Sequence, residues 1–284
     1  MSVTIDMVKE LRERSAAGMM DCKKALEECN GDMDKAIDWL RQKGLSQVAK
    51  RSSRAATEGR VSLRTSADEK IAMLTEVRCE TDFVSRGEKF QAFADFVANT
   101  AFEKNPPSSE ELRALVEEEF QTLLAQTGEN TIIGRLTRME LSGPGVIGKY
   151  IHTNEKLGVL VDLGCENSAT AEKEEFKELA KNIAMQIAAS APLSIDAACL
   201  DQAEIARERE VLRQKTLEEG KPENMVDKIV DGRIKKFYQE VCLLEQTYIR
   251  DDKKSIAQLL DEEGKALGDK ITVRAFFRIQ LGEE

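Results

Sequence analysis

The stretch from residue 199 to residue 242 constrains the fold more than any other, because apolar residues are sparse in it and charged residues are dense. Gly220-Lys221-Pro222 marks a turn near its middle, since proline suits the first turn of a helix. Apolar residues recur at intervals of four and seven on the two sides of this turn: Ile205, Leu212, Val226, Val230 and Phe237. A seam this narrow can hold a short coiled coil together but cannot form a globular core. We therefore expect residues 199–242 to form an antiparallel helical hairpin that projects from a domain.

Residues 1–46 are predicted to form a compact module of three short helices. Apolar residues recur at helical spacing in each of them: Ile5, Val8 and Leu11; Cys22, Leu26 and Cys29; and Ala36, Ile37 and Leu40. Asn30-Gly31 marks a turn, Asp32 is placed to cap the third helix, and Gly44 is expected to end it. Residues 47–58 lose the long apolar side chains and gain basic ones, so they form either a linker or a basic extension of the third helix.

The rest of the chain alternates between strand-like and helix-like patterns, which predicts an α+β core. Residues 59–141 are expected to form a first subdomain and residues 142–284 a second, which contains the hairpin. Strands are predicted at residues 61–65, 71–77, 131–141, 146–152, 157–163, 241–249 and 271–279, and helices at 86–104, 109–126, 172–190 and 255–261. The first two strands should pair as an antiparallel hairpin. Both subdomains mix strands with helices, but no residue-level repeat is evident.

The composition is that of a folded, charged protein, since 41% of its 284 residues are hydrophobic and 33% are charged. The net charge of -10 disfavours a nucleic acid as the main ligand, and a basic protein surface or a site that already holds a cation fits better. No stretch approaches the ~20 apolar residues that span a bilayer, and the N-terminus has no apolar signal core. We therefore expect a soluble cytoplasmic protein with no membrane partner and no direct nucleic-acid partner.

Neither a metal site nor a cofactor site is expected. The six cysteines form no C-x-x-C pair and His152 is the only histidine, whereas a zinc site needs about four ligands in paired spacing. The cysteines are interpreted as thiols in a reducing cytosol. No serine or cysteine has a visible catalytic partner, and no carboxylate lies in an isolated apolar setting that would raise its pKa. The sequence therefore offers no positive support for an enzyme.

Residues 143–149 match a phosphate-binding pattern but not its context. Their glycines fit G-x-G-x-x-G, and with Lys149 the segment nearly fits the phosphate loop. That loop requires a serine or threonine after the lysine, where this chain has Tyr150, and a helix must follow to hold the phosphate at its N-terminus. A strand-like segment follows instead. We interpret residues 143–149 as a connection between strands.

Thr81-Asp82-Phe83-Val84 is the most unusual segment of the chain, because an acid and a large aromatic residue lie side by side at a strand-to-helix junction. Two interpretations are open. In the first, Thr81 or Asp82 caps the following helix while Phe83 packs beneath it as a hydrophobic staple. In the second, the loop displays the acid and the aromatic residue to a partner. Local physical chemistry alone favours the first.

Seven motifs, in order along nearly the whole chain, carry a family resemblance. They are Val8-Lys9-Glu10-Leu11-Arg12, Gly18-Met19-Met20-Asp21-Cys22-Lys23-Lys24-Ala25-Leu26, Asn30-Gly31-Asp32, Ala36-Ile37, Thr81-Asp82-Phe83-Val84 with Phe90-Gln91-Ala92-Phe93-Ala94, Ile183-Ala184-Met185-Gln186-Ile187-Ala188-Ala189 and Gly220-Lys221-Pro222. With them the chain closely resembles the bacterial elongation factor Ts family. The resemblance implies an N-terminal module similar to a ubiquitin-associated domain, two α+β subdomains and a projecting coiled-coil arm.

The resemblance also implies a function, namely guanine-nucleotide exchange on GDP-bound elongation factor Tu in translation elongation. In the family, the acid and the aromatic residue of the Thr81–Val84 segment, here Asp82 and Phe83, intrude beside the partner's nucleotide site and lead to loss of its magnesium, so that GDP leaves and GTP can bind. Further partner contacts are implied at Met19, Met20 and Lys23 in the N-terminal module and at Leu157, Gly158 and Gln186 in the second subdomain.

Two features depart from the family pattern. The family often has histidine where this chain has Gln186, and the chain ends soon after Phe276-Phe277-Arg278-Ile279, so an additional C-terminal helical module is not expected. Two other functions are alternatives: a ubiquitin-associated-like adaptor with a coiled-coil arm, and a nucleotide-binding enzyme that uses residues 143–149. The sequence leaves open whether the complex is one-to-one or a dimer of heterodimers, although a projecting arm favours a second interface.

Overall fold

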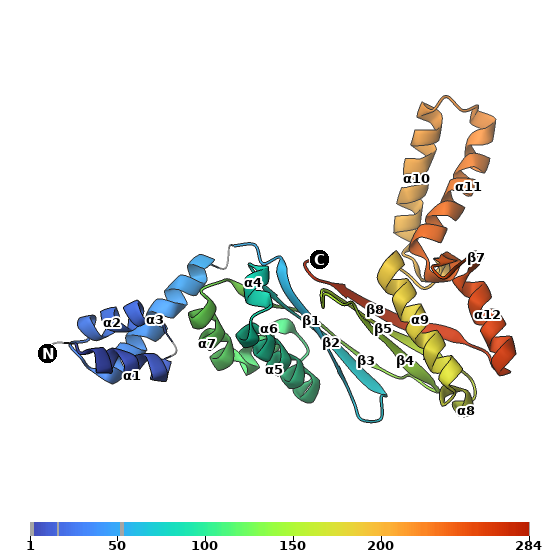
Figure 1. Ribbon diagram of the computed structural model, residues 1–284. Coiled ribbons are helices and arrows are strands. Elements are labelled where there is room, and N and C mark those ends of the chain that lie inside the picture. The colour runs from blue at the N-terminus through green and yellow to red at the C-terminus, as the bar shows by residue number, and fades with distance from the viewer. Residues whose placement is uncertain (1–2, 16, 52–53, 284) are drawn as a thin grey trace.

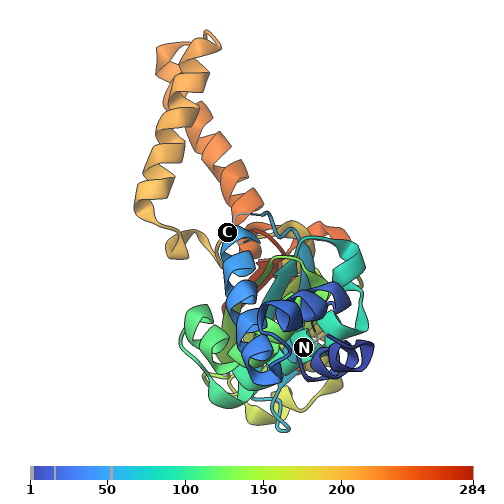
Figure 2. The same cartoon turned by 90° about the vertical axis from the view of Figure 1, so that its left-hand side faces the viewer.

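The computed structural model describes residues 3–15, 17–51 and 54–283. The molecule is elongated, with a helical bundle at one end, two sheets and their covering helices in the middle, and a helical arm that rises from the other end (Figure 1). A second view shows the arm standing clear of the core (Figure 2). The order of elements confirms the predicted α+β class, in which three N-terminal helices precede a core of sheets and helices.

The N-terminal bundle consists of α1 (Ile5–Ser15), α2 (Met19–Glu28) and α3 (Met33–Arg51). Its small core is formed by six buried side chains: Val8, Leu11, Cys22, Ala25, Leu26 and Ala36. Asp32 caps α3 as predicted, because its carboxylate accepts a hydrogen bond from the N–H of Lys35 at 3.1 Å.

Gly44 does not end the third helix, which continues to Arg51. A single glycine inside a helix costs only about 1 kcal/mol relative to alanine, so the helical pattern on both sides of it prevails. The first part of residues 47–58, which were expected to be either a linker or an extension of the third helix, therefore continues the helix. The side chains of Lys50 and Arg51, which suggested a basic surface, lie outside the described residues. The predicted domain boundaries stay predictions.

The first sheet is antiparallel in the order β1-β2-β3. Its strands are β1 (Glu58–Thr65), β2 (Ile71–Cys79) and β3 (Thr131–Glu140), and its helices are α4 (Asp82–Ser85), α5 (Glu88–Lys104), α6 (Ser109–Leu115) and α7 (Glu117–Thr127). The predicted hairpin of the first two strands is confirmed. The single helix predicted at residues 109–126 is wrong: the chain breaks at Val116, whose backbone leaves the helical region while its side chain is fully buried.

The second sheet is antiparallel in the order β4-β5-β8. Its strands are β4 (Gly145–Ile151), β5 (Leu157–Gly164) and β8 (Thr272–Gln280), and its helices are α8 (Ser168–Ala171), α9 (Glu174–Ser190) and α12 (Ile256–Leu267). The strand predicted at residues 241–249 is wrong. Cys242 and Leu243 are buried, and Leu243 packs in the core beside α9 and α12. Only Thr247–Tyr248 (β6) is extended, and it pairs with Asp251–Ser255 (β7) alone. A short apolar run cannot be assigned to strand or core turn from its pattern.

The two sheets pack back to back, with helices on both outer sides. Alternate residues of a strand face opposite ways, so Met73 and Val77 of β2 contact the helices while Leu74 faces the other sheet. The cluster between the sheets is formed by Val61, Ala72, Leu74, Met139, Ile147, Leu160, Ile279 and Leu281. Gly158 permits the close approach, because a Cβ atom there would lie 2.8 Å from Val61 and 2.9 Å from Leu74.

The predicted hairpin forms the arm, with α10 (Gln202–Glu218) and α11 (Glu223–Val241) running antiparallel. Its seam consists of Val226, Val230 and Ile234, against which Leu212 and Tyr238 pack. Ile234 takes the place predicted for Phe237, because the buried face of α11 advances in steps of four residues. Among the described side chains, three ion pairs join α10 and its C-terminal cap to α11: Arg209–Asp231, Arg213–Asp227 at 3.0 Å and Arg233–Glu219 at 2.6 Å. The narrow seam and these pairs hold the arm together.

Residues 59–106 and 145–192, the first parts of the two halves of the core, share a residue-level repeat, contrary to the expectation of only a coarse similarity. One constant spacing along the chain, without insertion or deletion, aligns the following identical residues: Gly59 and Gly145, Glu69 and Glu155, Lys70 and Lys156, Cys79 and Cys165, Glu80 and Glu166, Phe90 and Phe176, and Pro106 and Pro192. The identities are scattered, and they become evident only when the strands and helices of the two halves are aligned.

The backbone repeats as well. Gly59 and Gly145 both lie within the first two residues of an edge strand and have positive φ, at 146° and 157°. Glu69 and Glu155 both adopt positive φ in the hairpin turns, at 56° and 55°. In each half the central strand also buries one acid, which pairs with an arginine of the third strand: Glu76 with Arg135 at 3.3 Å, and Asp162 with Arg274 at 3.5 Å.

A carboxylate closes the strand-to-helix junction in the second half, and we call this arrangement the Asp269 clamp. The two oxygens of Asp269 accept hydrogen bonds from the N–H groups of Glu166 and Asn167, both at 3.0 Å. The Thr170 hydroxyl, together with these N–H groups, lowers the pKa of Asp269 to about 2. The clamp ties the segment before β8 to the start of α8.

Gly59→Ala is expected to destabilise the protein by at least about 2 kcal/mol. The added Cβ would lie 2.1 Å from the carbonyl oxygen of Val77, and the backbone has positive φ. Urea unfolding of the variant measures the loss. Gly220→Ala is the matched control, since Gly220 also has positive φ but no atom within 4 Å, and it should cost only about 1 kcal/mol. Equal losses would show that the close approach does not require glycine.

Asp269→Asn is expected to lower the free energy of unfolding at pH 7 and to flatten its decrease in acid. The folded-state pKa of Asp269 is lowered from 3.8 to about 2, so the carboxylate stabilises the fold above its unfolded pKa, and this contribution is lost as the pH falls from about 4 to about 2. Urea unfolding of both proteins across this range measures the effect. A variant with an unchanged acid slope would contradict it.

Candidate functional site

Thr81-Asp82-Phe83-Val84 begins a separate helix of one turn, α4, between β2 and α5. Thr81 is its N-cap: the residue has extended backbone angles, and its hydroxyl oxygen accepts a hydrogen bond from the N–H of Val84 at 3.4 Å. A helix of four residues gains too few hydrogen bonds to offset the cost of its nucleation. Contacts from outside the helix must therefore hold it.

Glu129 supplies such contacts, in an arrangement that we call the Glu129 clamp. One oxygen of its carboxylate accepts hydrogen bonds from the N–H groups of Glu80 at 3.1 Å and Thr81 at 3.0 Å, and the other accepts the Thr81 hydroxyl at 2.6 Å. The clamp matches the Asp269 clamp of the second half. Sequence reasoning missed Glu129, which lies 48 positions from Thr81, because no local pattern links a loop residue to so distant a segment.

The clamped turn places Phe83 in solvent, with 86% of the residue exposed. Asp82 beside it is also accessible and pairs with Arg86 at 3.2 Å on the surface. Val84 points the other way and packs against the core of the first half. The expected cap is confirmed at Thr81. The expected hydrophobic staple is wrong, because Phe83 is exposed and does not pack beneath the helix. The structure instead has the arrangement of the second interpretation, in which Asp82 and Phe83 are displayed on the surface.

The junction is also tied to the segment that precedes β1. The carboxylate of Glu80 accepts hydrogen bonds from the N–H of Asn130 at 2.6 Å and from the guanidinium of Arg54 at 3.4 Å. The amide of Asn130 donates to the carbonyl of Arg54 at 2.8 Å. Burial, with the nearby charge of Glu129, raises the pKa of Cys79 to about 12, so this thiol is neutral and unsuited to nucleophilic chemistry.

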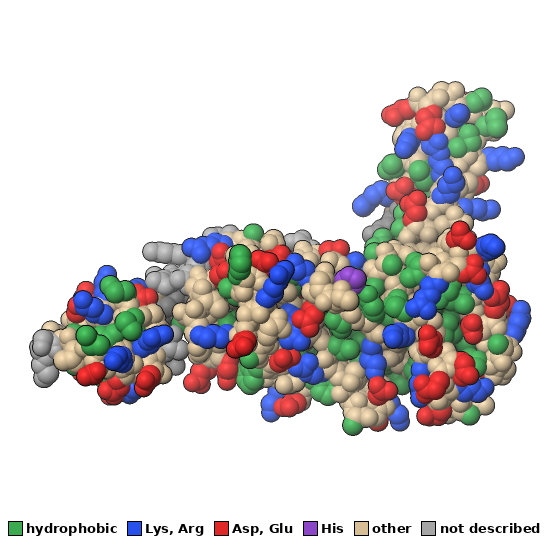
Figure 3. Space-filling model, in the orientation of Figure 1, with side chains coloured by type: hydrophobic (Ala, Val, Ile, Leu, Met, Phe, Trp, Pro, Cys, Tyr) green, Lys and Arg blue, Asp and Glu red, His purple; other side chains and the backbone are tan. Residues whose placement is uncertain are grey.

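The N-terminal bundle displays apolar side chains of its own. Met20 is 75% exposed and Met19 is 48% exposed, and Lys23 on the same helix reaches Glu27 at 3.8 Å on the surface. On the face shown in Figure 3, hydrophobic side chains gather at the centre of this bundle and charged ones surround them. The three positions implied by the resemblance are therefore accessible to a partner, and their contact with one stays a prediction.

The three positions implied in the second subdomain are buried instead: Leu157, Gly158 and Gln186. Leu157 and Gly158 begin β5 in the centre of the second sheet, and Gly158 lies against the first sheet. Residue type alone does not reveal which way a strand residue faces. Direct contact with a partner is not open to these three side chains in this conformation.

Gln186 is fully buried at the centre of a hydrogen-bond network. Its amide nitrogen lies 3.0 Å from the Ser190 hydroxyl, 3.2 Å from the side-chain oxygen of Gln246 and 3.2 Å from the carbonyl of Thr247. Its oxygen accepts the N–H of Ile249 at 2.9 Å. The network joins α9 to the loop after the arm and holds that loop in place, leaving Ile249 half exposed.

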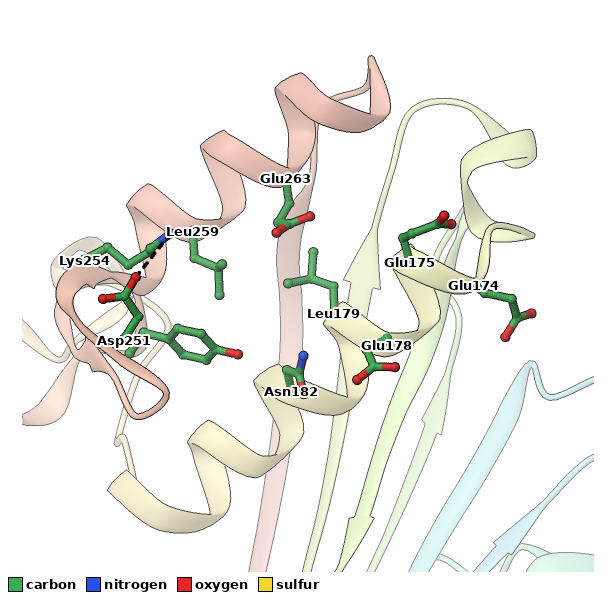
Figure 4. Close-up of a pocket in the computed structure, with 10 residues that line it drawn as sticks. Glu174, Glu175, Glu178, Leu179, Asn182, Asp251, Lys254, Leu259 and Glu263 are labelled. Atoms are coloured by element: carbon green, nitrogen blue, oxygen red, sulfur yellow. Dashed lines mark ion pairs between the residues drawn. The ribbon is translucent and has the colours of Figure 1, made fainter.

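A groove with a volume of about 570 Å³ lies between α9 and α12. Figure 4 shows Leu179 and Leu259 facing each other between the helices, with the carboxylates of Glu178 and Glu263 around them. Within residues 3–15, 17–51 and 54–283, no group of three or more metal-ligating side chains could hold a metal ion. The groove is therefore lined by acids and apolar side chains, without such a metal-binding group among the described residues.

The segment at residues 143–149 leads directly into a strand, as predicted, because β4 begins at Gly145. Lys149 is engaged by Glu69 at 2.5 Å. The anion-binding helix N-terminus that a phosphate loop requires does not follow. In the part of the chain that the structure describes, no helix is long and apolar enough to cross a membrane.

Comparison with known proteins places the chain in one family. A family model described as Elongation factor TS matches residues 80–283. The protein named Elongation factor Ts of Desulfovibrio desulfuricans is 54% identical over 100% of this chain and 99% of its own length. Those of Nitratidesulfovibrio vulgaris strain DP4 and Lawsonia intracellularis are 55% and 53% identical, over 100% of this chain and 97% and 100% of their own lengths. The chain therefore belongs to the elongation factor Ts family of translation elongation factors.

Proposed function

We propose that this protein is a guanine-nucleotide exchange factor for elongation factor Tu, and that it binds the GDP form. The observation that carries the proposal is Phe83, a large apolar side chain held 86% exposed beside a carboxylate. Leaving such a side chain in water costs about 1.5–3 kcal/mol relative to its burial. An exposed aromatic residue on a rigid turn is what a protein–protein contact uses as an anchor. Membership of the family identifies the partner.

Asp82 and Phe83 act on the magnesium ion of the partner. Magnesium bridges the phosphates of a bound nucleotide and takes few protein ligands. Phe83 supplies the binding energy of an apolar wedge and Asp82 a negative charge, so that inserting them beside the nucleotide site disturbs the coordination of the ion. GDP then loses the cation that neutralises its phosphates and leaves, and GTP can bind in its place.

No covalent chemistry by this protein is required, and we assign it neither enzymatic activity nor a cofactor. Exchange follows from linkage: a factor that weakens the binding of GDP to the partner is itself bound less tightly when GDP is present, by the same free energy. The net charge of -10 suits a partner site that holds a cation rather than a nucleic acid. Translation places the activity in the cytoplasm.

The N-terminal bundle adds affinity through Met19, Met20 and Lys23, which contact the nucleotide-binding domain of the partner. In the second half, Gln186 acts indirectly, because it is buried and holds the loop that carries the half-exposed Ile249. This surface contacts a second domain of the partner. Assembly of two complexes through the arm, as a dimer of heterodimers, remains a prediction.

Asp82→Ala combined with Phe83→Ala is expected to slow exchange at least about 30-fold, since an anchor of this kind costs ~2 kcal/mol or more on truncation. Release of fluorescent GDP from elongation factor Tu measures the rate, with and without the factor. Phe277→Ala, which removes a half-exposed aromatic side chain from β8, is the control and should leave the rate within twofold. Wild-type factor that does not accelerate release would favour the adaptor function instead.

Met19→Ala combined with Met20→Ala is expected to raise the factor concentration that gives half-maximal GDP release by about tenfold, because two exposed apolar contacts are lost. The maximal rate should change little, since α4 is untouched. A titration of the factor at fixed partner concentration separates the two quantities. A lower maximal rate at unchanged half-saturation would assign the bundle a part in the exchange step itself.

A further inference from the structure

We propose that Glu129 is the positioning residue of the exchange site, and that its carboxylate keeps Asp82 and Phe83 displayed. The inference rests on the proposed function and adds a residue to which no role has been assigned. Glu129 lies between α7 and β3, and it touches Thr81 and Glu80 rather than the acid–aromatic pair itself. Its effect on the partner is therefore indirect.

The clamp acts on the N-terminal side of α4, where the N–H groups of Glu80 and Thr81 and the Thr81 hydroxyl all donate to Glu129. On the C-terminal side, the Ser85 hydroxyl donates to the carbonyl of Asp82 at 3.1 Å, and Gln91 donates to the carbonyl of Ser85 at 2.5 Å. On the N-terminal side, three hydrogen bonds end on Glu129. The Thr81 hydroxyl donates its one hydrogen bond to Glu129, and this orients the hydroxyl oxygen to accept a hydrogen bond from the N–H of Val84. The backbone conformation of the first turn of α4 therefore depends on Glu129.

Solvent works against the display of Phe83. An aromatic side chain that is 86% exposed gains free energy by folding back onto any apolar surface nearby. Val84 packs against the apolar core under α4, so a turn that is free to rotate would bring Phe83 onto that core in its place. A turn of only four residues would yield to this tendency unless its backbone were fixed. Charge-assisted hydrogen bonds from backbone N–H groups to a carboxylate are strong enough to fix it.

The second half of the core provides the internal comparison. The Asp269 clamp holds an equivalent junction through the N–H groups of Glu166 and Asn167. In place of the acid and the aromatic residue, that junction carries Ser168 and Ala169. Both halves therefore use a carboxylate to rigidify the junction, and only the first half displays an acid and an aromatic residue on it. A substitution of Asp269 is thus a control, because it removes the same kind of interaction from the junction of the second half.

The experiment compares Glu129→Gln with Asp269→Asn in the full-length protein. Hydrogen exchange of the isolated variants is measured at the amides of residues 80–84 and 166–170, and stimulated release of fluorescent GDP is measured against factor concentration. Glu129→Gln should speed amide exchange at residues 80–84 at least tenfold and lower the maximal rate of GDP release at least fivefold. Asp269→Asn should speed exchange only at residues 166–170 and leave GDP release within twofold.

A double-mutant cycle tests whether Glu129 acts through the acid–aromatic pair. In the background of Asp82→Ala with Phe83→Ala, Glu129→Gln should have no further effect on GDP release. An additional loss of the same size would show that Glu129 acts elsewhere and would overturn the proposal. Unchanged protection of residues 80–84 in Glu129→Gln would also overturn it, whether or not the wild-type factor promotes exchange.

Two further variants keep the test decisive if Glu129→Gln does not fold. Thr81→Ser retains the hydroxyl that links Glu129 to Val84, and it should keep the maximal rate within twofold of wild type. Thr81→Val removes the hydroxyl at nearly constant volume and should lower the maximal rate as Glu129→Gln does. Equal rates in these two variants would contradict the role of the clamp.

Discussion

The hydrogen bonds from backbone N–H groups to one carboxylate at each strand-to-helix junction are the interaction on which the proposed site depends. A central strand ends there, and the chain must turn within a few residues to lay a long helix across the sheet. The turn leaves N–H groups without partners. Glu129 and Asp269 accept them from a segment far along the chain. Each clamp therefore joins two distant parts of one subdomain and makes the junction rigid.

Repetition of this unit explains how the core could carry one specialised surface. Both halves keep the glycine that begins the edge strand, the buried acid of the central strand and the clamped junction. These features serve the fold, and they leave the first turn after the strand free to vary. The first half has Asp82 and Phe83 at this turn, where the second has Ser168 and Ala169. A stable scaffold and a variable exposed turn are a common basis for binding sites.

The arm and the N-terminal bundle have little core of their own and extend from the two ends of the sheets (Figure 1). Three buried residues of α11 and three ion pairs hold the arm, and six buried residues hold the bundle. Surface ion pairs contribute little individually, so both parts should open more readily than the sheets. Such extensions enlarge the surface that a partner can contact without enlarging the core.

Local pattern in the sequence determined the helical hairpin, the three N-terminal helices, most strands of the two sheets and the cap at Thr81, because each depends on residues close together in the chain. The unusual pairing of Asp82 with Phe83 was also visible there, and family resemblance gave it a meaning. Tertiary structure alone decided that Phe83 faces solvent, that Gln186 is buried and that Glu129 holds the turn. The exposure of a side chain and its long-range hydrogen bonds depend on which distant segments pack together. The periodicity of residues along the chain does not specify this packing.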